Sequence, residues 1–401
     1  MERLYKKYVN ETVDEKGRLT AITFNRPDDF NFAYDVVDVL AKRSPDKRAM
    51  MWVSPDGLEK DITFKDVAEN SAKVANYLVK KGIKKGDKVM LVLKRRYEFW
   101  YCCIALHKIG AVLIPATHQL MKKDFLYRFL AAGVKGLICT VDDNVHHEAE
   151  KAMNEYDGIK VRMTIKKKVE GWDFYDEEVE KESTYFPRPQ GDADTRTDDI
   201  MLMFFTSGTT GYPKIAAHTF EYPLGHITTA VWWHDVNPDG LHFTIADTGW
   251  GKAMWGKLYG QWLAESAVFT YDYDRFNAHD MLSLFEKYGI TTFCAPPTIY
   301  RMLIKEDISS YNLSYLKHAT IAGEALNPEV FKQFYNATGL KLMEGFGQTE
   351  STLLIGNLLG TEPKPGSMGK PVPQYEIDLV DENGNTVPAG AEGEIVIRTD
   401  K

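Results

Sequence analysis

The segment Thr206–Lys214, with the sequence TSGTTGYPK, has the residue types of a loop that binds phosphate. It directly follows the apolar run MLMFF, which predicts that a strand ends where the loop begins. Backbone N–H groups exposed at glycines, together with nearby hydroxyls, can surround phosphate oxygens, and a lysine adds positive charge. The residues that would do this are Thr206, Ser207, Gly208, Thr209, Thr210, Gly211 and Lys214. The spacing differs from that of the common GxxxxGK(S/T) loop, and a surface turn is the alternative interpretation.

A second segment with chemical potential is Met343–Glu350, MEGFGQTE, where a predicted strand runs into a glycine turn. Phe346 offers a flat face for a purine, and Thr349 offers a hydroxyl to a phosphate. Glu350 offers a carboxylate, and Mg²⁺ in proteins is typically held by one or two carboxylates together with phosphate oxygens and water. Alone, this pattern also fits a purely structural turn.

Two weaker segments end or follow predicted strands. Ala322–Leu326, AGEAL, lies at a strand end, which is where open α/β sheets bind ligands. Asp247–Lys257, DTGWGKAMWGK, brings Trp250, Lys252 and Trp255 close together among glycines. Two tryptophans at this density are usually part of a core, with the wall of a substrate pocket next to the phosphate loop as the alternative. His218 and His226 lie just beyond the phosphate loop, and we interpret both as packing histidines, with contact to substrate as the alternative.

Alternating helical and strand patterns surround these segments and predict an α/β fold with largely parallel sheets covered by helices. We expect strands at 88–93, 111–114 and 135–140, and helices at 97–108, 124–132 and 145–153, after a first helix capped by Thr63. A second block has expected strands at 200–205, 241–246, 266–270, 291–295, 317–322 and 341–344, and helices at 221–234, 277–288 and 328–337. Short antiparallel strands at 376–380 and 393–398 flank an Asn-Gly turn.

The predicted organisation has four parts. Residues 1–59 form an arm and the first elements, with a polar surface arm over 1–30. Residues 60–185 form a first α/β subdomain, and a Pro- and Asp-rich linker at 186–199 leads to a second one, 200–355, which contains the predicted phosphate loop. Residues 356–401 form part of a small antiparallel β-barrel-like subdomain.

Composition excludes several classes of protein. The 401 residues carry a net charge of −8, which disfavours a general nucleic-acid binder. The four cysteines include no CxxC pair and are expected to be free thiols of a reducing compartment. No secretory signal or uninterrupted apolar stretch of about 20 residues is present, so we expect a cytoplasmic protein without a membrane span. An assembly of identical subunits is compatible with the sequence.

In their order along the chain, these segments resemble the adenylate-forming superfamily of acyl-CoA synthetases, peptide-synthetase adenylation domains and luciferases. The resemblance covers roughly residues 30–401 and includes GSMGKPVP at Gly366–Pro373. DTGW and the stretch APPTIYRML at Ala295–Leu303 are most similar to the medium-chain acyl-CoA synthetase branch. The resemblance implies the large N-terminal domain of an enzyme that uses ATP, Mg²⁺ and coenzyme A to activate a carboxylic acid.

The resemblance also implies roles for individual residues. Thr206–Lys214 would hold the β- and γ-phosphates of ATP, Thr349 would contact the α-phosphate and Glu350 would ligate Mg²⁺, so that Lys214, Thr349 and Glu350 act in catalysis. The rest of the ATP site would comprise Glu324, Ala325, Glu344, Gly345, Phe346, Gly347 and Gln348. The acyl pocket would be lined by Trp250, Lys252, Trp255 and Gly347, and Gln119 would approach coenzyme A. The family usually has Tyr where this chain has Phe346, so ring stacking is kept and a hydroxyl contact is lost.

Gly347 bears on the choice of acid. Relatives resembling acetyl-CoA synthetases have Trp at this position, which closes the pocket behind a two-carbon acid. Glycine should leave room for several methylenes, each contributing about 0.8 kcal/mol when buried, so we expect a short- to medium-chain acid longer than acetate. Trp255 is a second residue that would cap the pocket.

Three family elements would follow residue 398: a ribose-binding Asp, a hinge, and a small C-terminal domain with a catalytic Lys. Since none is in the sequence, we expect a fragment with impaired catalysis. The alternatives are a ligase for an aryl acid or an amino acid, with Asp247 pairing the substrate amine, and a non-catalytic module that binds a nucleotide or an acyl-adenylate.

Overall fold

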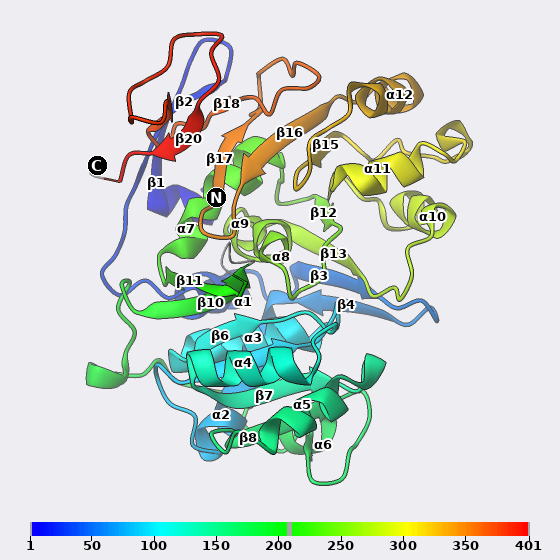
Figure 1. Cartoon of the computed structure of the whole chain (residues 1–401). Helices are drawn as coiled ribbons and strands as arrows, with labels where there is room; N and C mark the ends of the chain where they lie inside the picture. The colour runs from blue at the N-terminus through cyan, green and yellow to red at the C-terminus, as the bar shows by residue number, and fades with distance from the viewer. Residues whose placement is uncertain (1, 207–210, 400–401) are drawn as a thin grey trace.

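The computed structural model describes residues 2–206 and 211–399. Two large β-sheets with helices on their faces make up most of this part of the chain (Figure 1). The two sheets lie one above the other in Figure 1, with further helices between them. The α/β class with largely parallel sheets is therefore confirmed.

The first sheet has seven strands in the order β11-β10-β6-β5-β7-β8-β9. All neighbours pair in parallel except β10 and β11, which form an antiparallel hairpin. The central strands are almost continuously apolar, as expected for parallel strands that are buried on both faces. The strands are β5 (Lys88–Val92), β6 (Val112–Pro115), β7 (Val134–Thr140), β8 (Val161–Ile165), β9 (Asp173–Phe174), β10 (Ile200–Thr206) and β11 (Lys214–Thr219).

Alternate residues of these strands pack against different helices. Met90 and Val92 of β5 belong to a core with α4 and α5, whereas Val89 and Leu91 belong to a core with α2 and α3. This division follows from the two-residue period of side chains in a strand. The helices are α2 (Phe64–Lys80), α3 (Glu98–Ile109), α4 (Lys122–Ala132), α5 (Val145–Met153) and α6 (Tyr175–Val179).

The second sheet has nine strands in the order β18-β17-β16-β15-β14-β12-β13-β3-β4. Its six central strands are parallel to one another. At the edges, β4 pairs with β3, β17 with β16 and β18 with β17, each in antiparallel fashion. The strands are β3 (Arg48–Val53), β4 (Glu59–Thr63), β12 (Leu241–Thr244), β13 (Ala267–Tyr271), β14 (Thr292–Ala295), β15 (His318–Ile321), β16 (Leu342–Gly347), β17 (Leu353–Gly356) and β18 (Lys370–Pro371). One face packs against α10 (Ala278–Tyr288), α11 (Pro297–Leu303) and α12 (Pro328–Thr338).

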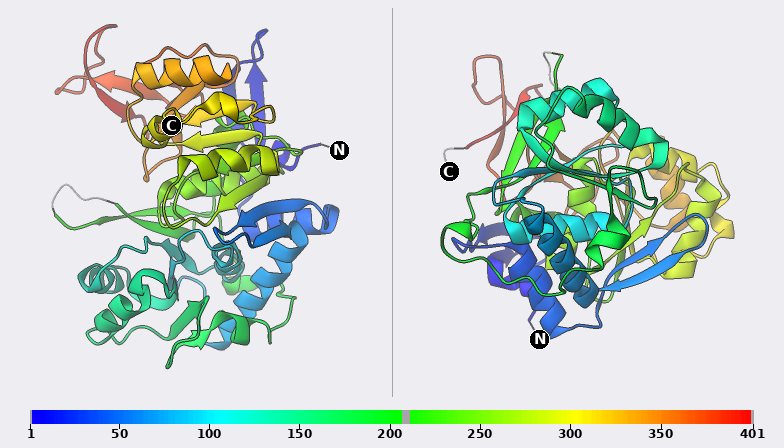
Figure 2. Two further views of the ribbon diagram at one scale, coloured as in Figure 1. Left: turned by 90° about the vertical axis from the view of Figure 1, so that its right-hand side faces the viewer. Right: turned by 90° about the horizontal axis from the view of Figure 1, so that it is seen from below.

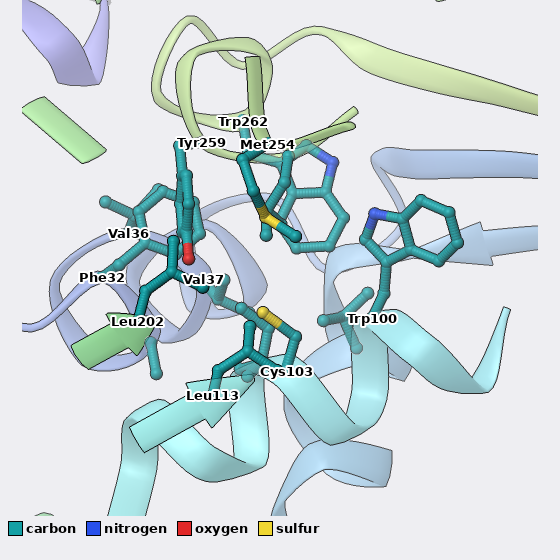
Figure 3. Packing of buried hydrophobic residues seen from close by; sticks show 14 of the residues in the cluster. Phe32, Val36, Val37, Trp100, Cys103, Leu113, Leu202, Met254, Tyr259 and Trp262 are labelled. Atoms are coloured by element: carbon teal, nitrogen blue, oxygen red, sulfur yellow. The ribbon is translucent and has the colours of Figure 1, made fainter. Parts of the chain in front are cut away.

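The largest core lies between the two sheets. Figure 3 shows Phe32, Trp100, Cys103, Tyr259 and Trp262 packed together there, with contributions from both sheets. Trp262 stacks on Phe32, and its indole N–H donates to the carbonyl of Ala49 at 3.0 Å. The elements in this layer include η2 (Ala33–Asp38), α1 (Val39–Arg43), α7 (Tyr222–Ile227), η5 (Thr228–Trp233), α8 (Gly251–Gly256) and α9 (Tyr259–Leu263). The expected helix at 221–234 is thus divided into α7 and η5.

Each of the two sheets contains strands from outside the residue range that the sequence predicted for one subdomain. β3, which precedes the predicted first subdomain, and β4, which overlaps its first residues, belong to the second sheet, whereas β10 and β11, from the range 200–355, belong to the first. The ranges 60–185 and 200–355 stay a prediction as folding units, but they do not correspond to the two sheets. The reason is that strand partners are chosen by tertiary packing, which a local hydrophobic pattern does not encode.

Two small antiparallel ribbons complete the described chain. The N-terminal residues form a hairpin of β1 (Val9–Val13) and β2 (Leu19–Phe24), with Tyr5 and Tyr8 buried, so the expected polar arm over 1–30 is wrong in that it contributes to the core. β19 (Ile377–Val380) pairs with β20 (Glu394–Ile397) near the other end, as the Asn-Gly turn predicted. The four cysteines are buried and free. No helix among the described residues is long and apolar enough to cross a membrane.

Candidate active site

The predicted phosphate loop connects the two strands of the β10–β11 hairpin. Thr206 pairs with Lys214 at its end, and the left view of Figure 2 shows the hairpin extending beyond the sheets. Ser207, Gly208, Thr209 and Thr210 lie outside the described residues. Gly211 has a φ of +99°, in the left-handed region that favours glycine.

The far side of this loop is attached to α4. The ring of Tyr212 stacks on that of Tyr127 with centroids 5.2 Å apart, and the Tyr127 hydroxyl donates to the carbonyl of Pro213 at 2.7 Å. Lys214 is exposed. The described part of the hairpin therefore presents Lys214 to solvent beside a segment that aromatic packing holds against α4.

The GFGQTE turn leaves β16 at Gly347 and returns as β17. Nε2 of His218, on β11, lies 2.7 Å from the main-chain carbonyl oxygen of Thr349. Because a carbonyl only accepts, Nε2 carries the proton. Burial lowers the pKa of His218, and this hydrogen bond and Glu350 oppose that effect. One hydrogen bond thus joins the phosphate-loop hairpin of the first sheet to the QTE turn of the second.

The predicted adenine residues come together at the ends of β15 and β16. The buried carboxylate of Glu344 accepts from the backbone N–H of Leu326 at 3.4 Å, and burial raises the pKa of Glu344. Glu324 is exposed, and the Thr298 hydroxyl donates to its carboxylate at 2.8 Å. Ala325 is exposed and Phe346 half-buried, which leaves both within reach of a ligand.

The DTGW segment lies at the junction of the two sheets. A Cβ at Gly249 would be 2.4 Å from the backbone nitrogen of Thr117, so only glycine permits this approach. Gln119, the predicted coenzyme A residue, is exposed on the same loop as Thr117.

Asp247 is occupied by protein partners. Its side chain is 9% exposed, and its Oδ2 atom lies 3.4 Å from Nη1 of Arg95 and 3.4 Å from Nδ1 of His118. Burial opposes ionisation, but His118, Arg95 and the backbone N–H of Gly249 together lower the pKa of Asp247. A carboxylate with these partners is not free to pair with a substrate amine.

The three side chains predicted to line the acyl pocket, Trp250, Lys252 and Trp255, differ in their exposure and in their contacts. Trp250 is 61% exposed, whereas Trp255 is 7% exposed. Nζ of Lys252 donates to the carbonyl of Ala322 at 2.8 Å, and burial lowers the pKa of Lys252. Within residues 2–206 and 211–399, Lys252 has no carboxylate at ion-pair distance. The two tryptophans therefore do not form one wall.

Trp255 fills the space that the absence of a side chain at Gly347 was expected to leave open. A Cβ at Gly347 would lie 2.2 Å from Cη2 of Trp255 and 2.4 Å from the carbonyl oxygen of Thr352. The indole of Trp255 therefore takes up part of the room expected behind Gly347, while the length of the acid stays a prediction.

Glu350 fits the expected magnesium ligand in its chemistry. Its side chain is exposed next to Thr349, and it forms no ion pair with any residue that the structure describes. A carboxylate of this kind can share a magnesium ion with phosphate oxygens. Lys214 and Glu350 are both exposed and carry opposite charges, and their predicted roles toward a magnesium-bound polyphosphate stay a prediction.

Some residues at the site have no marker in the sequence. His218 and His226 were interpreted as packing histidines, and His218 does pack, but its bond to Thr349 also positions the turn. His226 is buried with neither ring nitrogen hydrogen-bonded by any described residue. Arg95 and His118 reach Asp247 from the other sheet, a contact that residue spacing does not reveal.

Comparisons with known proteins agree with this geometry. Residues 37–401 match the family model described as AMP-binding enzyme. The human mitochondrial acyl-coenzyme A synthetase ACSM3 is 38% identical over 381 residues, covering 93% of this chain and 64% of the relative. The rat mitochondrial acyl-coenzyme A synthetase ACSM4 is 36% identical over 395 residues, covering 96% and 67%. This chain therefore spans about two thirds of the length of these relatives.

Solved structures with the same fold include a Brucella canis acyl-CoA synthetase, with a TM-score of 0.84 and 25% identity, covering 93% of this chain and 68% of that one. The anthranilate CoA ligase AuaEII in complex with anthranoyl-AMP has a TM-score of 0.83 and 26% identity, covering 94% and 71%. With the family model matching most of its length, the chain belongs to the AMP-binding enzyme family.

Proposed function

We propose that this chain is the nucleotide- and acid-binding part of an AMP-forming acyl-CoA synthetase. The observation that carries the proposal is the hydrogen bond between His218 and Thr349, which joins two predicted phosphate-binding segments from different sheets. Relatives named acyl-coenzyme A synthetases support it. ATP, a carboxylic acid and coenzyme A would be the substrates.

The reaction has two steps. A carboxylate oxygen of the acid attacks the α-phosphorus of ATP, and pyrophosphate leaves. The sulfur of coenzyme A then attacks the acyl carbonyl of the adenylate, and AMP leaves with the electron pair of the broken bond. Bound Mg²⁺ would supply charge neutralisation at the phosphates.

The protein's contribution is positioning and charge stabilisation. Lys214 and the backbone of the phosphate loop hold the β- and γ-phosphates, and Thr349, fixed by His218, contacts the α-phosphate. Glu350 would hold the magnesium ion. The face of Phe346 and the strand ends at Glu324 and Glu344 form the adenine site.

For the acid, we propose a short chain longer than acetate. Gly347 carries no side chain that would limit the pocket, but Trp255 lies against it and limits the length from the other side. The optimum is therefore at the short end of the predicted range. Lys252 and Trp255 line the pocket, whereas Trp250 lies at its mouth.

An aryl acid is the second candidate, and the likeness to an anthranilate CoA ligase favours it. An amino acid is disfavoured, because Asp247 is already paired with Arg95 and His118. The release of pyrophosphate on addition of acid and MgATP distinguishes the two remaining alternatives. An enzyme releases pyrophosphate, whereas a module that only binds an adenylate does not.

The acid class is tested by the thermal midpoint of the chain with non-hydrolysable acyl-adenylate analogues of two to eight carbons and a benzoyl analogue. A ligand at 100 times its dissociation constant stabilises the folded state by about 2.7 kcal/mol. We expect the largest shift above two carbons, and an optimum at greater length in Trp255→Phe. The exposed His279→Gln serves as the matched control and should keep the wild-type profile. A flat profile in both proteins would contradict the proposed chain length.

We further propose a cytoplasmic location and assembly from identical subunits. The mammalian relatives are named mitochondrial, so cell fractionation is the direct test of the location. Analytical ultracentrifugation tests the assembly.

A further inference from the structure

Helix α7 places unpartnered polar atoms behind the proposed acyl pocket. Both ring nitrogens of His226 are buried and form no hydrogen bond with a described residue. The buried Tyr222 hydroxyl has no hydrogen bond of normal geometry among the described residues, although the side chain of Trp255 is near enough to oppose the rise that burial causes in the pKa of Tyr222. Tyr222 is 7% exposed and His226 is fully buried. We call these two side chains the α7 polar pair.

The α7 polar pair is connected to the reacting end of the site. The Tyr222 ring stacks on that of His218 with centroids 4.0 Å apart, and His218 is bonded to the carbonyl of Thr349. Tyr222 therefore lies one side chain away from the residue proposed to contact the α-phosphate.

The pair is also connected to the far end of the pocket. The His226 ring lies 4.6 Å from that of Tyr222 and 6.0 Å from that of Trp255, measured between centroids. Trp255 in turn lies against Gly347. The α7 polar pair is thus linked to the turn from Gly347 to Thr349 on two sides, through His218 at one end and through Trp255 at the other.

The helix and the turn are packed tightly at this place. A Cβ at Gly225 of α7 would lie 3.1 Å from Cγ2 of Thr352, the residue whose carbonyl faces Gly347. The side chain of His226 follows directly in the sequence. The backbone of α7 at Gly225, between Tyr222 and His226 in the sequence, therefore packs against the residue that follows the GFGQTE turn.

The chemistry of the pair selects the class of group that it can bind. Burial lowers the pKa of His226 to about 3, so the imidazole is neutral and offers one donor and one acceptor. The Tyr222 hydroxyl likewise donates and accepts. A charged group would have to be buried without an opposite charge, which is strongly unfavourable, whereas a hydroxyl or amide matches both partners.

We propose that Tyr222 and His226 bind an uncharged hydrogen-bonding substituent, a hydroxyl in the simplest case, on the acyl chain of the acid that this site activates. The inference rests on the proposed function and specifies its substrate class. An acid without such a substituent leaves buried polar atoms unpaired, which costs free energy in the complex.

The test compares matched acyl-adenylate analogues that differ by one hydroxyl: pentanoyl against 3-, 4- and 5-hydroxypentanoyl, and benzoyl against 2-, 3- and 4-hydroxybenzoyl. Dissociation constants are measured by calorimetry. We expect at least one hydroxylated analogue to bind on the order of 100-fold more tightly than its parent, which is a smaller ratio than the roughly 10⁴- to 10⁵-fold discrimination of sites built to bond a hydroxyl.

Two variants tie this preference to the pair. Tyr222→Phe keeps the ring that stacks on His218 and removes only the hydroxyl, so it should reduce the preference without lowering the thermal midpoint of the free protein. His226→Phe should reduce or invert the preference. His242→Phe is the matched control, because His242 is equally buried but both its ring nitrogens are bonded to threonines; it should keep the wild-type ratio.

The outcomes separate the two levels of inference. If no analogue binds, alkyl ones included, the proposed function fails and this inference fails with it. If alkyl and hydroxylated analogues bind equally and both variants leave the ratio unchanged, the proposed function stands and the α7 polar pair is merely hydrated in the wall. A lower midpoint in Tyr222→Phe with an unchanged ratio would equally overturn the substrate role.

Discussion

Acid should destabilise this protein through histidines that are buried in their neutral form. Burial lowers the pKa of His107, His226 and His242 to about 3 each. An unfolded chain has a histidine pKa of about 6.5. The folded state therefore binds fewer protons below pH 6.5, and the stability contributed by each neutral histidine is fully present above that pH and is lost as the pH falls towards 3.

The magnitude follows from the two pKa values. pH 5 lies about 1.5 pH units below the histidine pKa of the unfolded chain but above that of the folded chain. Protonation therefore stabilises the unfolded state by about 2 kcal/mol per histidine, and the folded state gains almost nothing. Three such histidines sum to about 6 kcal/mol, comparable with the total stability of many domains, about 5–15 kcal/mol. Between pH 7.5 and 5 we therefore expect a large loss of resistance to urea.

A variant isolates the histidine contribution from that of other groups. Buried carboxylates such as Glu98, whose pKa burial raises, bind protons in the folded state and act with the opposite sign. Urea unfolding of wild type and His226→Phe at pH 7.5, 6 and 5 should give curves of stability against pH that diverge by about 2 kcal/mol at pH 5. The exposed His147→Gln is the control and should parallel wild type. Parallel curves for His226→Phe would refute the reasoning.

Two further predictions concern packing and capping. Gly347→Ala should destabilise the fold by about 1–3 kcal/mol, because its Cβ would collide with Trp255 and with the Thr352 carbonyl. The control is Gly356→Ala, whose Cβ would be 3.4 Å from its nearest neighbour and which should be close to neutral in urea unfolding. Equal urea midpoints for the two variants would show that the structure relieves the collision at Gly347 at little cost. Thr63→Ala should cost about 1 kcal/mol in the same assay, because Thr63 and Asp66 form a capping box at the start of α2; no change would mean that tertiary packing alone holds this helix end.

Local signals in the sequence were sufficient where the physical cause is local. α2 begins after Thr63 and α5 occupies residues 145–153, both as expected. A helix start depends on a capping side chain and a few residues beyond it, and a buried parallel strand shows itself as an apolar run. The phosphate loop and the GFGQTE turn are contiguous segments, so the sequence alone also identified the family.

Only the tertiary structure decided which of these segments meet. The sequence contains no sign that β3 and β10 belong to opposite sheets from their neighbours in the chain, that His218 bonds to the carbonyl of Thr349, or that Trp255 fills the space at Gly347. Hydrophobic periodicity reports that a residue is buried but not against what. The packing of α7 and α8 near the GFGQTE turn joins segments that are far apart in the sequence, and the size of the proposed acyl pocket depends on it.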